Sequence, residues 1–225
     1  MSRVLIVGAG PAGIRAAQRL VAAGLHPVVV DEGARAGGQI YRRPPEGFTR
    51  PPQTLYGSEA DKALDLHRCF DRMLDAGQLS YHPRSSVVAL GAQGAQVLGP
   101  DGVDTLAYDK LILATGATDR LAPVPGWQSA GVYSLGATQI ALKSQGVALG
   151  RRMVLAGSGP LLTLVASQLR KAGAQVVAVL DTAPLTTQAA GVIGMALARP
   201  RVTLRGAVMR AGLGRSYHAG VTLTR

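Results

Sequence analysis

Three glycines near the start of the chain have the spacing needed to contact a pyrophosphate. Gly8, Gly10 and Gly13 form a complete G-x-G-x-x-G that includes Pro11 and Ala12. In such a turn the first glycine permits the bend, the second lets a pyrophosphate approach the backbone, and the third lets a helix pack closely on the preceding strand. The N-terminus of that helix would offer free N–H groups and the positive end of its dipole. This turn is therefore a candidate dinucleotide site.

The elements around the turn must be a strand, a helix and a second strand. Residues 3–7 are apolar, residues 11–23 place apolar side chains on one helical face, and residues 28–30 are three valines. All three fit within about thirty residues, as in a right-handed parallel βαβ unit. Asp31 follows the second strand, 23 positions after the first glycine, where its carboxylate can accept hydrogen bonds from ribose hydroxyls; Glu32 is the adjacent candidate. These residues alone allow either NAD or FAD.

The rest of the first half alternates between loops and short elements. Residues 33–57 are rich in Gly, Pro and Arg and predict a loop, after which Ser58 begins a helix with an acidic first turn. Residues 85–90 predict a strand, and the turn at residues 99–102 joins two further β-like segments. We therefore expect a small antiparallel crossover, followed by a buried strand at residues 111–114.

The strand–turn–helix–strand pattern returns in the second half of the chain. Gly157 and Gly159 take the first two glycine positions, Leu162 takes the third, and Asp181 lies 24 positions after Gly157. Leucine at the third position would push the helix away from the strand and narrow the phosphate site. Asp181 would favour a free ribose 2′-hydroxyl. We expect either NAD(P) or another adenine nucleotide here, or a retained fold without one.

Together these patterns predict an α/β fold with two dinucleotide-type units. A Rossmann-like dinucleotide-binding βαβ with an antiparallel crossover would occupy residues 1–122, and residues 123–149 would connect it to the second unit. Residues 150–225 would form a second, incomplete Rossmann-like NAD(P)-type unit, and we expect this domain to be truncated.

The charge balance raises nucleic acid as a partner, but the distribution of the charge argues against it. The formal net charge is +11 at pH 7, and 20 of the 24 basic residues are arginines spread along the chain. No basic run is interleaved with the aromatic residues that nucleic-acid-binding modules use. We therefore expect no nucleic-acid partner; an anionic cofactor or an acidic partner subunit would match part of the charge.

The cysteine and histidine content excludes several other kinds of site. Cys69 is the single cysteine, which excludes a disulfide framework, a Cys-x-x-Cys redox pair and a Cys-rich metal site. The four histidines lack metal-ligand spacing, and no serine lies in a G-x-S-x-G elbow. We assign no catalytic side chain and no metal, because redox chemistry would come from a cofactor. No apolar run is long enough to span a membrane, and a cytoplasmic location is the default expectation.

Gly37-Gly38-Gln39 and residues 113–116 (Leu-Ala-Thr-Gly) resemble two segments of the two-dinucleotide-domain flavoproteins, where the first approaches the flavin and the second, the A-T-G segment, passes near FAD. This resemblance favours FAD at the first turn and implies that residues 1–122 form a Rossmann-like FAD-binding domain. By this resemblance a backbone group of Val87 meets the adenine. The residues that the resemblance places near FAD are Gly38, Gln39, Ala114, Thr115 and Gly116.

A closer resemblance narrows the family. Residues 36–44 (Ala-Gly-Gly-Gln-Ile-Tyr-Arg-Arg-Pro) are similar to the alpha-type subunits of opine oxidases, hydrogen cyanide synthase and related amino-acid dehydrogenase complexes, as are residues 131–133, 141–147 and 155–162. The resemblance covers residues 3–182. It implies an FAD-dependent oxidoreductase subunit of a complex that oxidises a small amine or amino acid. A beta-type flavoprotein subunit would carry the substrate-oxidising flavin, and Arg43 would be a flavin or phosphate neighbour.

One departure from these relatives leaves two alternatives open. They close the FAD site with a late Gly-Asp pair, and none follows residue 182 in this sequence. The chain could instead be a non-catalytic subunit that binds ADP or ATP and supports assembly. It could also be an NAD(P)H-dependent flavin reductase, although Leu162 argues against this. We expect the substrate contacts to lie on a partner or on residues outside this sequence.

Overall fold

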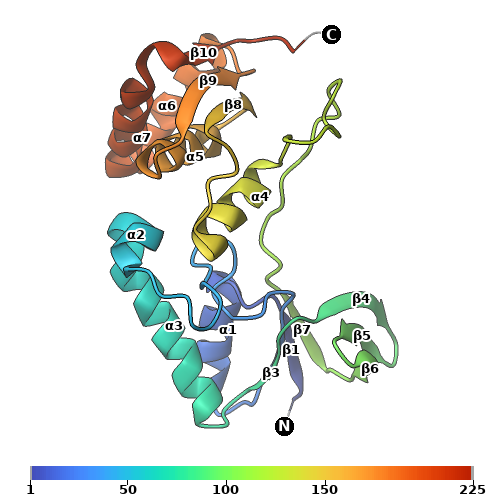
Figure 1. Cartoon of the computed structure of the whole chain (residues 1–225). Helices are drawn as coiled ribbons and strands as arrows, with labels where there is room; N and C mark the ends of the chain where they lie inside the picture. Colours follow the sequence, from blue (N-terminus) through green and yellow to red (C-terminus); the bar gives the residue numbers. More distant parts are fainter. Residues whose placement is uncertain (1, 224–225) are drawn as a thin grey trace. The chain divides into compact units, whose positions relative to one another are not determined.

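A computed structural model describes residues 2–223 and divides the chain into two compact units, Met1–Thr118 and Asp119–Arg225 (Figure 1). Each unit contains a parallel sheet with helices packed against it. The predicted α/β fold with two βαβ units is therefore confirmed. The described residues include no helix that is both long and apolar enough to cross a membrane.

The first unit is built on a four-stranded parallel sheet with the order β3-β2-β1-β7. These strands are β1 (Val4–Val7), β2 (Val28–Val30), β3 (Ser80–His82) and β7 (Lys110–Leu113). Successive strands are added on one side of β1 until β7 returns to its other side, so the strand order reverses at β1. Open parallel sheets bind ligands beyond the carboxyl ends of their strands at such a reversal.

Different elements cover the two faces of this sheet (Figure 1). Helices α1 (Pro11–Ala22) and α3 (Ala60–Asp75) pack on the face that carries Ile6 and Val29. The strands β4 (Ser86–Gly91), β5 (Gly94–Gly99) and β6 (Gly102–Leu106) form an antiparallel sheet, and buried side chains of β5 pack with Leu5 and Val30 of the opposite face. This confirms the predicted antiparallel crossover. The short helix α2 (Pro52–Tyr56) and strand β3 were not predicted.

The second unit repeats the βαβ arrangement. Strand β8 (Arg152–Gly157), helix α5 (Pro160–Lys171) and strand β9 (Gln175–Asp181) follow the predicted pattern, and β10 (Tyr217–Ala219) adds a third parallel strand beside β9. Helix α4 (Leu135–Ile140), which continues as a π-helical turn over Ala141–Gln145, lies within the segment 123–149 that was expected to connect the two units. Two helices not foreseen from the sequence, α6 (Leu185–Ala198) and α7 (Pro200–Leu213), separate β9 from β10.

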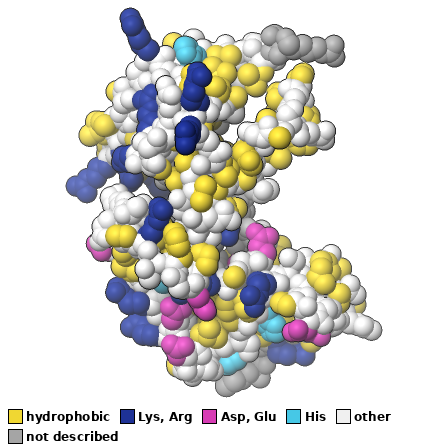
Figure 2. Space-filling model, in the orientation of Figure 1, with side chains coloured by type: hydrophobic (Ala, Val, Ile, Leu, Met, Phe, Trp, Pro, Cys, Tyr) yellow, Lys and Arg dark blue, Asp and Glu magenta, His cyan; other side chains and the backbone are white. Residues whose placement is uncertain are grey.

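The α6–α7 pair leaves much of its apolar surface exposed. No side chain of α6 is buried and no residue of α6 is charged; Ile193 and Leu197 are 65% and 83% exposed. Helix α7 buries only Leu213. Residues 182–225 contain no Asp or Glu, and basic side chains project from the surface over these helices in Figure 2. A short helix that is apolar all round is typical of one covered on several sides by protein.

Candidate dinucleotide-binding sites

The first glycine turn is shaped by steric limits at two of its glycines. Gly8 has φ +105°, and a Cβ there would collide with the carbonyl oxygen of Ala114. A Cβ at Gly13 would collide with the carbonyl oxygen of Gly8. The absence of side chains at these positions lets α1 lie directly against β1 and lets the segment after β7 lie against the turn. Gly13 therefore has the helix-packing role that the motif predicts, and the positive φ of Gly8 agrees with its predicted place at the bend; the close approach of Gly8 to Ala114 was not predicted.

The Gly37–Gly38 segment lies directly beside the turn. The Gly37 amide donates a hydrogen bond to the carbonyl oxygen of Ala9 over 2.8 Å. A Cβ at Gly38 would lie 2.8 Å from the Cα of Gly10, so the two glycine backbones are in contact. This brings together two segments that the sequence predicted to contact the same cofactor.

The segment Ala114–Ala117 completes the group at the carboxyl edge of the sheet. The Ala114 amide donates to the carbonyl oxygen of Val7 over 2.8 Å, which continues the pairing of β1 with β7. The side-chain amide of Gln39 donates to the carbonyl oxygen of Ala117 over 3.1 Å, while Thr115 and Gly116 are exposed. Gln39 therefore links the Gly-Gly segment to the A-T-G segment.

Of the two candidate acids after β2, Asp31 faces the turn. Its Oδ2 accepts a hydrogen bond from the Ala9 amide over 2.5 Å, and its Oδ1 accepts one from the Gly33 amide over 2.8 Å. Glu32 is exposed. The Ser85 amide donates to the carbonyl oxygen of Asp31 over 3.0 Å, so the chain leading to β4 runs beside this acid. The Val87 side chain packs on the core between the sheets, which leaves its backbone as the part that could meet an adenine.

The residues of this site fit a dinucleotide pyrophosphate. Pro11 and Ala12 begin α1, and Gly10, its N-cap, makes no side-chain capping bond, so no side chain blocks the first-turn N–H groups. The nearest atom to a Cβ at Gly10 would be the Cα of Gly38, 3.8 Å away, so the space above Gly10 is open. An open approach to uncapped helix amides is what a phosphate requires.

A hydrogen-bond network that the sequence did not predict connects the loop after Gly37–Gly38 to α3. Arg43 is only 9% exposed; its guanidinium donates to Oδ2 of Asp71 over 2.9 Å and to the carbonyl oxygen of His67 over 3.2 Å. The Nε2 of buried His67 lies 2.8 Å from the carbonyl oxygen of Tyr41, so Nε2 carries the proton. Burial lowers the pKa of His67 and favours its neutral form. The hydrogen bonds of Arg43 thus run to α3, where they brace the loop.

The second glycine turn has different surroundings. Gly157 and Gly159 have φ values of +154° and +93°, and Leu162 is a core residue that is 2% exposed. Asp181 is 4% exposed; its Oδ2 accepts a hydrogen bond from the hydroxyl of Tyr217 over 2.6 Å. The acid at the end of β9 is therefore already engaged by a side chain of β10.

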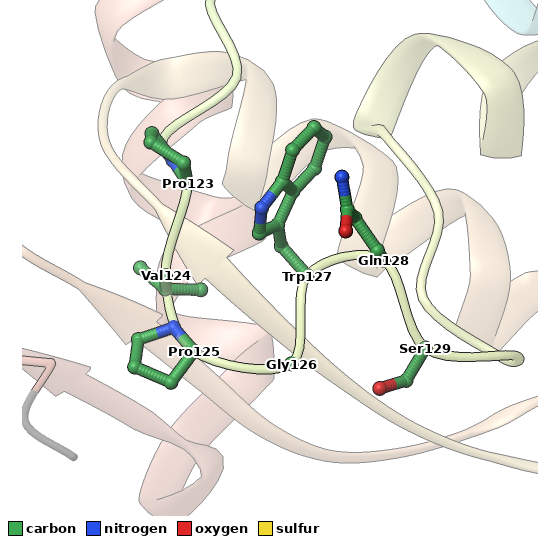
Figure 3. A pocket seen from close by; sticks show the side chains of 7 residues that line it. All are labelled: Pro123, Val124, Pro125, Gly126, Trp127, Gln128 and Ser129. Carbon is green, nitrogen blue, oxygen red and sulfur yellow. The ribbon is translucent and has the colours of Figure 1, made fainter.

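A hollow outside both turns does not belong to either site. It has a volume of about 510 Å³ and is lined by the residues Pro123–Ser129. Figure 3 shows this loop doubling back at Gly126, with the side chain of Trp127 between its two arms. Its lining comes from a single loop and includes no titratable side chain, so it offers no counterpart to the convergent segments of the first turn. Within residues 2–223 no cluster of three or more His, Cys, Asp or Glu side chains could hold a metal.

Comparison with known proteins identifies relatives among subunits of oxidising complexes. An opine oxidase subunit of Rhizobium meliloti is 44% identical over 193 residues, which is 81% of this chain and 36% of that protein. The hydrogen cyanide synthase subunit HcnB of Pseudomonas protegens is 35% identical over 216 residues, which is 93% of this chain and 44% of that protein. The chain thus spans less than half the length of these relatives.

Solved structures share the fold. The Cu(II) complex of the HOCl-induced flavoprotein disulfide reductase RclA from Escherichia coli matches with a TM-score of 0.65 at 19% identity, over 98% of this chain and 49% of that one. L-proline dehydrogenase from P. horikoshii matches with a TM-score of 0.60 at 20% identity, over 80% and 35%. The family described as pyridine nucleotide-disulphide oxidoreductase matches residues 2–205. The chain belongs to this family.

Proposed function

We propose that this chain is the FAD-binding part of an oxidoreductase subunit of the alpha type, with the ADP half of FAD across the first glycine turn. The observation that carries the proposal is the convergence of Gly8–Gly13, Gly37–Gln39 and Ala114–Gly116 around an uncapped helix N-terminus. The amides that begin α1 would bind the pyrophosphate and Asp31 the ribose. A backbone group of Val87 would meet the adenine. Gly38, Gln39 and the A-T-G segment would lie toward the flavin.

When bound, FAD would supply the two-electron chemistry, and the protein would bind and orient it. No side chain of this chain is assigned a proton-transfer or nucleophilic role. We propose a small amine or amino acid as the substrate of the whole complex, because the relatives include opine oxidase subunits and hydrogen cyanide synthase subunits. The contacts that select it would lie on the partner subunit. We propose a cytoplasmic location.

We propose that the partner is a beta-type flavoprotein subunit. It would dock on the exposed side chains of α6 and α7, which we call the α6–α7 surface. Two features support this: the apolar side chains of α6 are exposed, and residues 182–225 carry arginines without any acidic residue. An apolar surface that also carries basic side chains is complementary to an apolar surface that carries acidic ones. The partner surface would therefore combine exposed apolar side chains with acidic residues.

The test of the cofactor proposal is an absorbance spectrum of the purified protein, mass spectrometry of the nucleotide released on denaturation, and a titration with FAD. Gly10→Ala is the informative variant, because a Cβ there would fit the protein but occupy the phosphate space. We expect Gly10→Ala to keep its melting temperature and to lose at least about tenfold in FAD affinity, as expected when phosphate contacts are blocked. Gly206→Ala makes the same change on α7 in open space and should bind as the unaltered protein does. Unchanged FAD binding in Gly10→Ala would contradict the proposal.

The same experiment tests a second candidate function, a nucleotide-binding subunit without redox chemistry. The hydrogen bond from Tyr217 to Asp181 favours this second function. If the second turn binds no pyridine nucleotide, the chain holds no NADH that could reduce a flavin bound at the first turn. A colourless protein that releases ADP or ATP would support this second function. Rapid bleaching of bound flavin by NADH would instead support a flavin reductase.

A further inference from the structure

Each βαβ unit has one acid at the end of its second strand, Asp31 in the first unit and Asp181 in the second. The two acids accept the same first hydrogen bond but a different second one. Oδ1 of Asp31 accepts from the Gly33 amide over 2.8 Å, and Oδ1 of Asp181 accepts from the Ala183 amide over 2.9 Å, in each case two residues along the chain. Oδ2 of Asp31 then accepts from Ala9 in the glycine turn. Oδ2 of Asp181 accepts instead from the hydroxyl of Tyr217.

The tyrosine is itself held in place by β10 and α7. Tyr217 pairs with Val179 across the parallel ladder of β10 and β9. The guanidinium of Arg210 lies 4.4 Å from the centre of the Tyr217 ring, and it donates a hydrogen bond to Oε1 of Gln188 over 2.5 Å. The Tyr217 hydroxyl has one proton, and the shorter contact, 2.6 Å to Asp181 against 3.3 Å to Gln188, takes it. Burial, followed by the bond to Asp181, raises the pKa of Tyr217, so the hydroxyl stays a donor at neutral pH.

This arrangement removes the acid from the reach of a ribose. Asp181 is 4% exposed, whereas Asp31 is half-buried at the turn. The Thr182 amide and hydroxyl both donate to the carbonyl oxygen of Gly157, over 2.8 and 3.2 Å, which ties the end of β9 to the start of the second turn. A nucleotide whose ribose hydroxyls bound Asp181 would first have to displace Tyr217. The residues of the second turn therefore do not fit an NAD(H) ribose in this arrangement.

We propose that Tyr217 closes the ribose end of the second glycine turn, so that Asp181 acts as a structural acid and this unit does not take NAD(H). The inference concerns the second unit alone and goes beyond the proposed role of the first. Tyr217 is then the residue that excludes the nucleotide ribose from the second turn, acting through Asp181.

The test is a titration of the whole chain with NADH, in which binding is detected by the quenching of protein fluorescence. The unaltered protein should show no saturable binding, and Tyr217→Phe, which keeps the ring under Arg210 but removes the hydroxyl, should gain at least about tenfold in NADH affinity. Tyr133→Phe is the matched control, because Tyr133 is 52% exposed. A folded Tyr217→Phe protein, judged by circular dichroism, that gains no affinity would overturn the proposal.

A second variant decides the matter if Tyr217→Phe does not fold. Asp181→Asn should leave NADH binding as weak as in the unaltered protein, since the proposal gives the acid no ligand. Saturable NADH binding that Asp181→Asn weakens tenfold would overturn it. FAD binding is measured in the same samples, so that failure of the first site is recognised separately from failure of this inference.

Discussion

The Nε2 of His67 on α3 lies 2.8 Å from the carbonyl oxygen of Tyr41, four residues after Gly37. A Cβ at Gly37 would in turn lie 3.1 Å from the same nitrogen. The His67 imidazole therefore holds the Gly37–Gly38 segment against α3. Because the Gly37 amide is also bound to Ala9, the position of the segment relative to the glycine turn depends on His67.

Replacing His67 by Leu should destabilise the first unit. Leucine fills a similar space but cannot donate, so the carbonyl oxygen of Tyr41 that faces buried His67 would lose a partner at a cost of about 1–3 kcal/mol. His67→Gln, whose side-chain amide can donate, should recover part of the loss. Urea unfolding of the three proteins measures the free energies. Equal stability of the Leu and Gln variants would show that the hydrogen bond contributes nothing.

The same histidine should make stability depend on pH. Burial lowers the pKa of His67 from its ordinary 6.5, helped by the positive charges of Arg43 and Arg35 and opposed by the Tyr41 bond and the Asp71 charge. The unfolded chain then binds a proton more readily than the folded one, so the contribution is complete above the ordinary pKa and is lost as pH falls through and below it. We expect the melting temperature to fall from pH 7 to pH 5 and to fall less in His67→Gln.

The packing of the first turn should make Gly13 far less tolerant of substitution than other glycines. The Cβ of Gly13→Ala would collide with the Gly8 carbonyl oxygen, so α1 must move away from β1, at a cost of about 1–3 kcal/mol or more. Gly206→Ala, in open space on α7, should be neutral or stabilising by up to about 1 kcal/mol because alanine favours helix. Thermal unfolding followed by circular dichroism compares them. A Gly13→Ala protein as stable as Gly206→Ala would refute the close-packing role.

Local sequence patterns foretold those elements whose signals are local. The glycine turns with their flanking apolar runs predicted β1, α1 and β2 to within a few residues, and the order of β8, α5 and β9 in the second unit. Strand β3 has only three residues, Ser80–His82, which is too short for a strand pattern to be recognised. It is defined by its pairing with β2, which the local sequence does not reveal. Helix α6 is apolar without a helical period, and periodicity could not reveal it.

The site residues also fall into those with a local sequence signal and those whose role depends on tertiary packing. The candidates in glycine-rich segments could be found from the sequence because backbone geometry limits those positions to glycine. His67 and Asp71 could not be linked to Arg43, since that contact depends on how α3 packs. One signal was available for His67: it lies four residues after Ala63 and three before Phe70, on the buried face of α3. The hydrogen bond between Tyr217 and Asp181 joins residues 36 positions apart, so the second glycine motif gives no indication of it.

In the second unit, Leu162→Ala should lower stability without improving nucleotide binding. Leu162 is 2% exposed in the core around α5, and truncating a buried leucine costs about 2–5 kcal/mol. If leucine at the third glycine position were the main obstacle to NADH, the smaller side chain would restore affinity. Since Asp181 stays bound to Tyr217, we expect no gain in NADH binding, which equilibrium dialysis with NADH can measure. A clear gain would place the obstacle at Leu162.

On the proposed docking surface, Leu197→Gln should weaken association with the beta-type subunit while leaving the isolated chain as stable as before. Leu197 is 83% exposed, and exposed positions without special contacts change stability by about 0.5 kcal/mol or less. If a partner buries this side chain, its loss should reduce affinity by about tenfold or more. Sedimentation of the co-expressed subunits measures the association. Leu121→Gln, at another exposed leucine, is the control and should associate normally. Unchanged association of Leu197→Gln, or self-association of this chain through the same surface, would contradict the docking proposal.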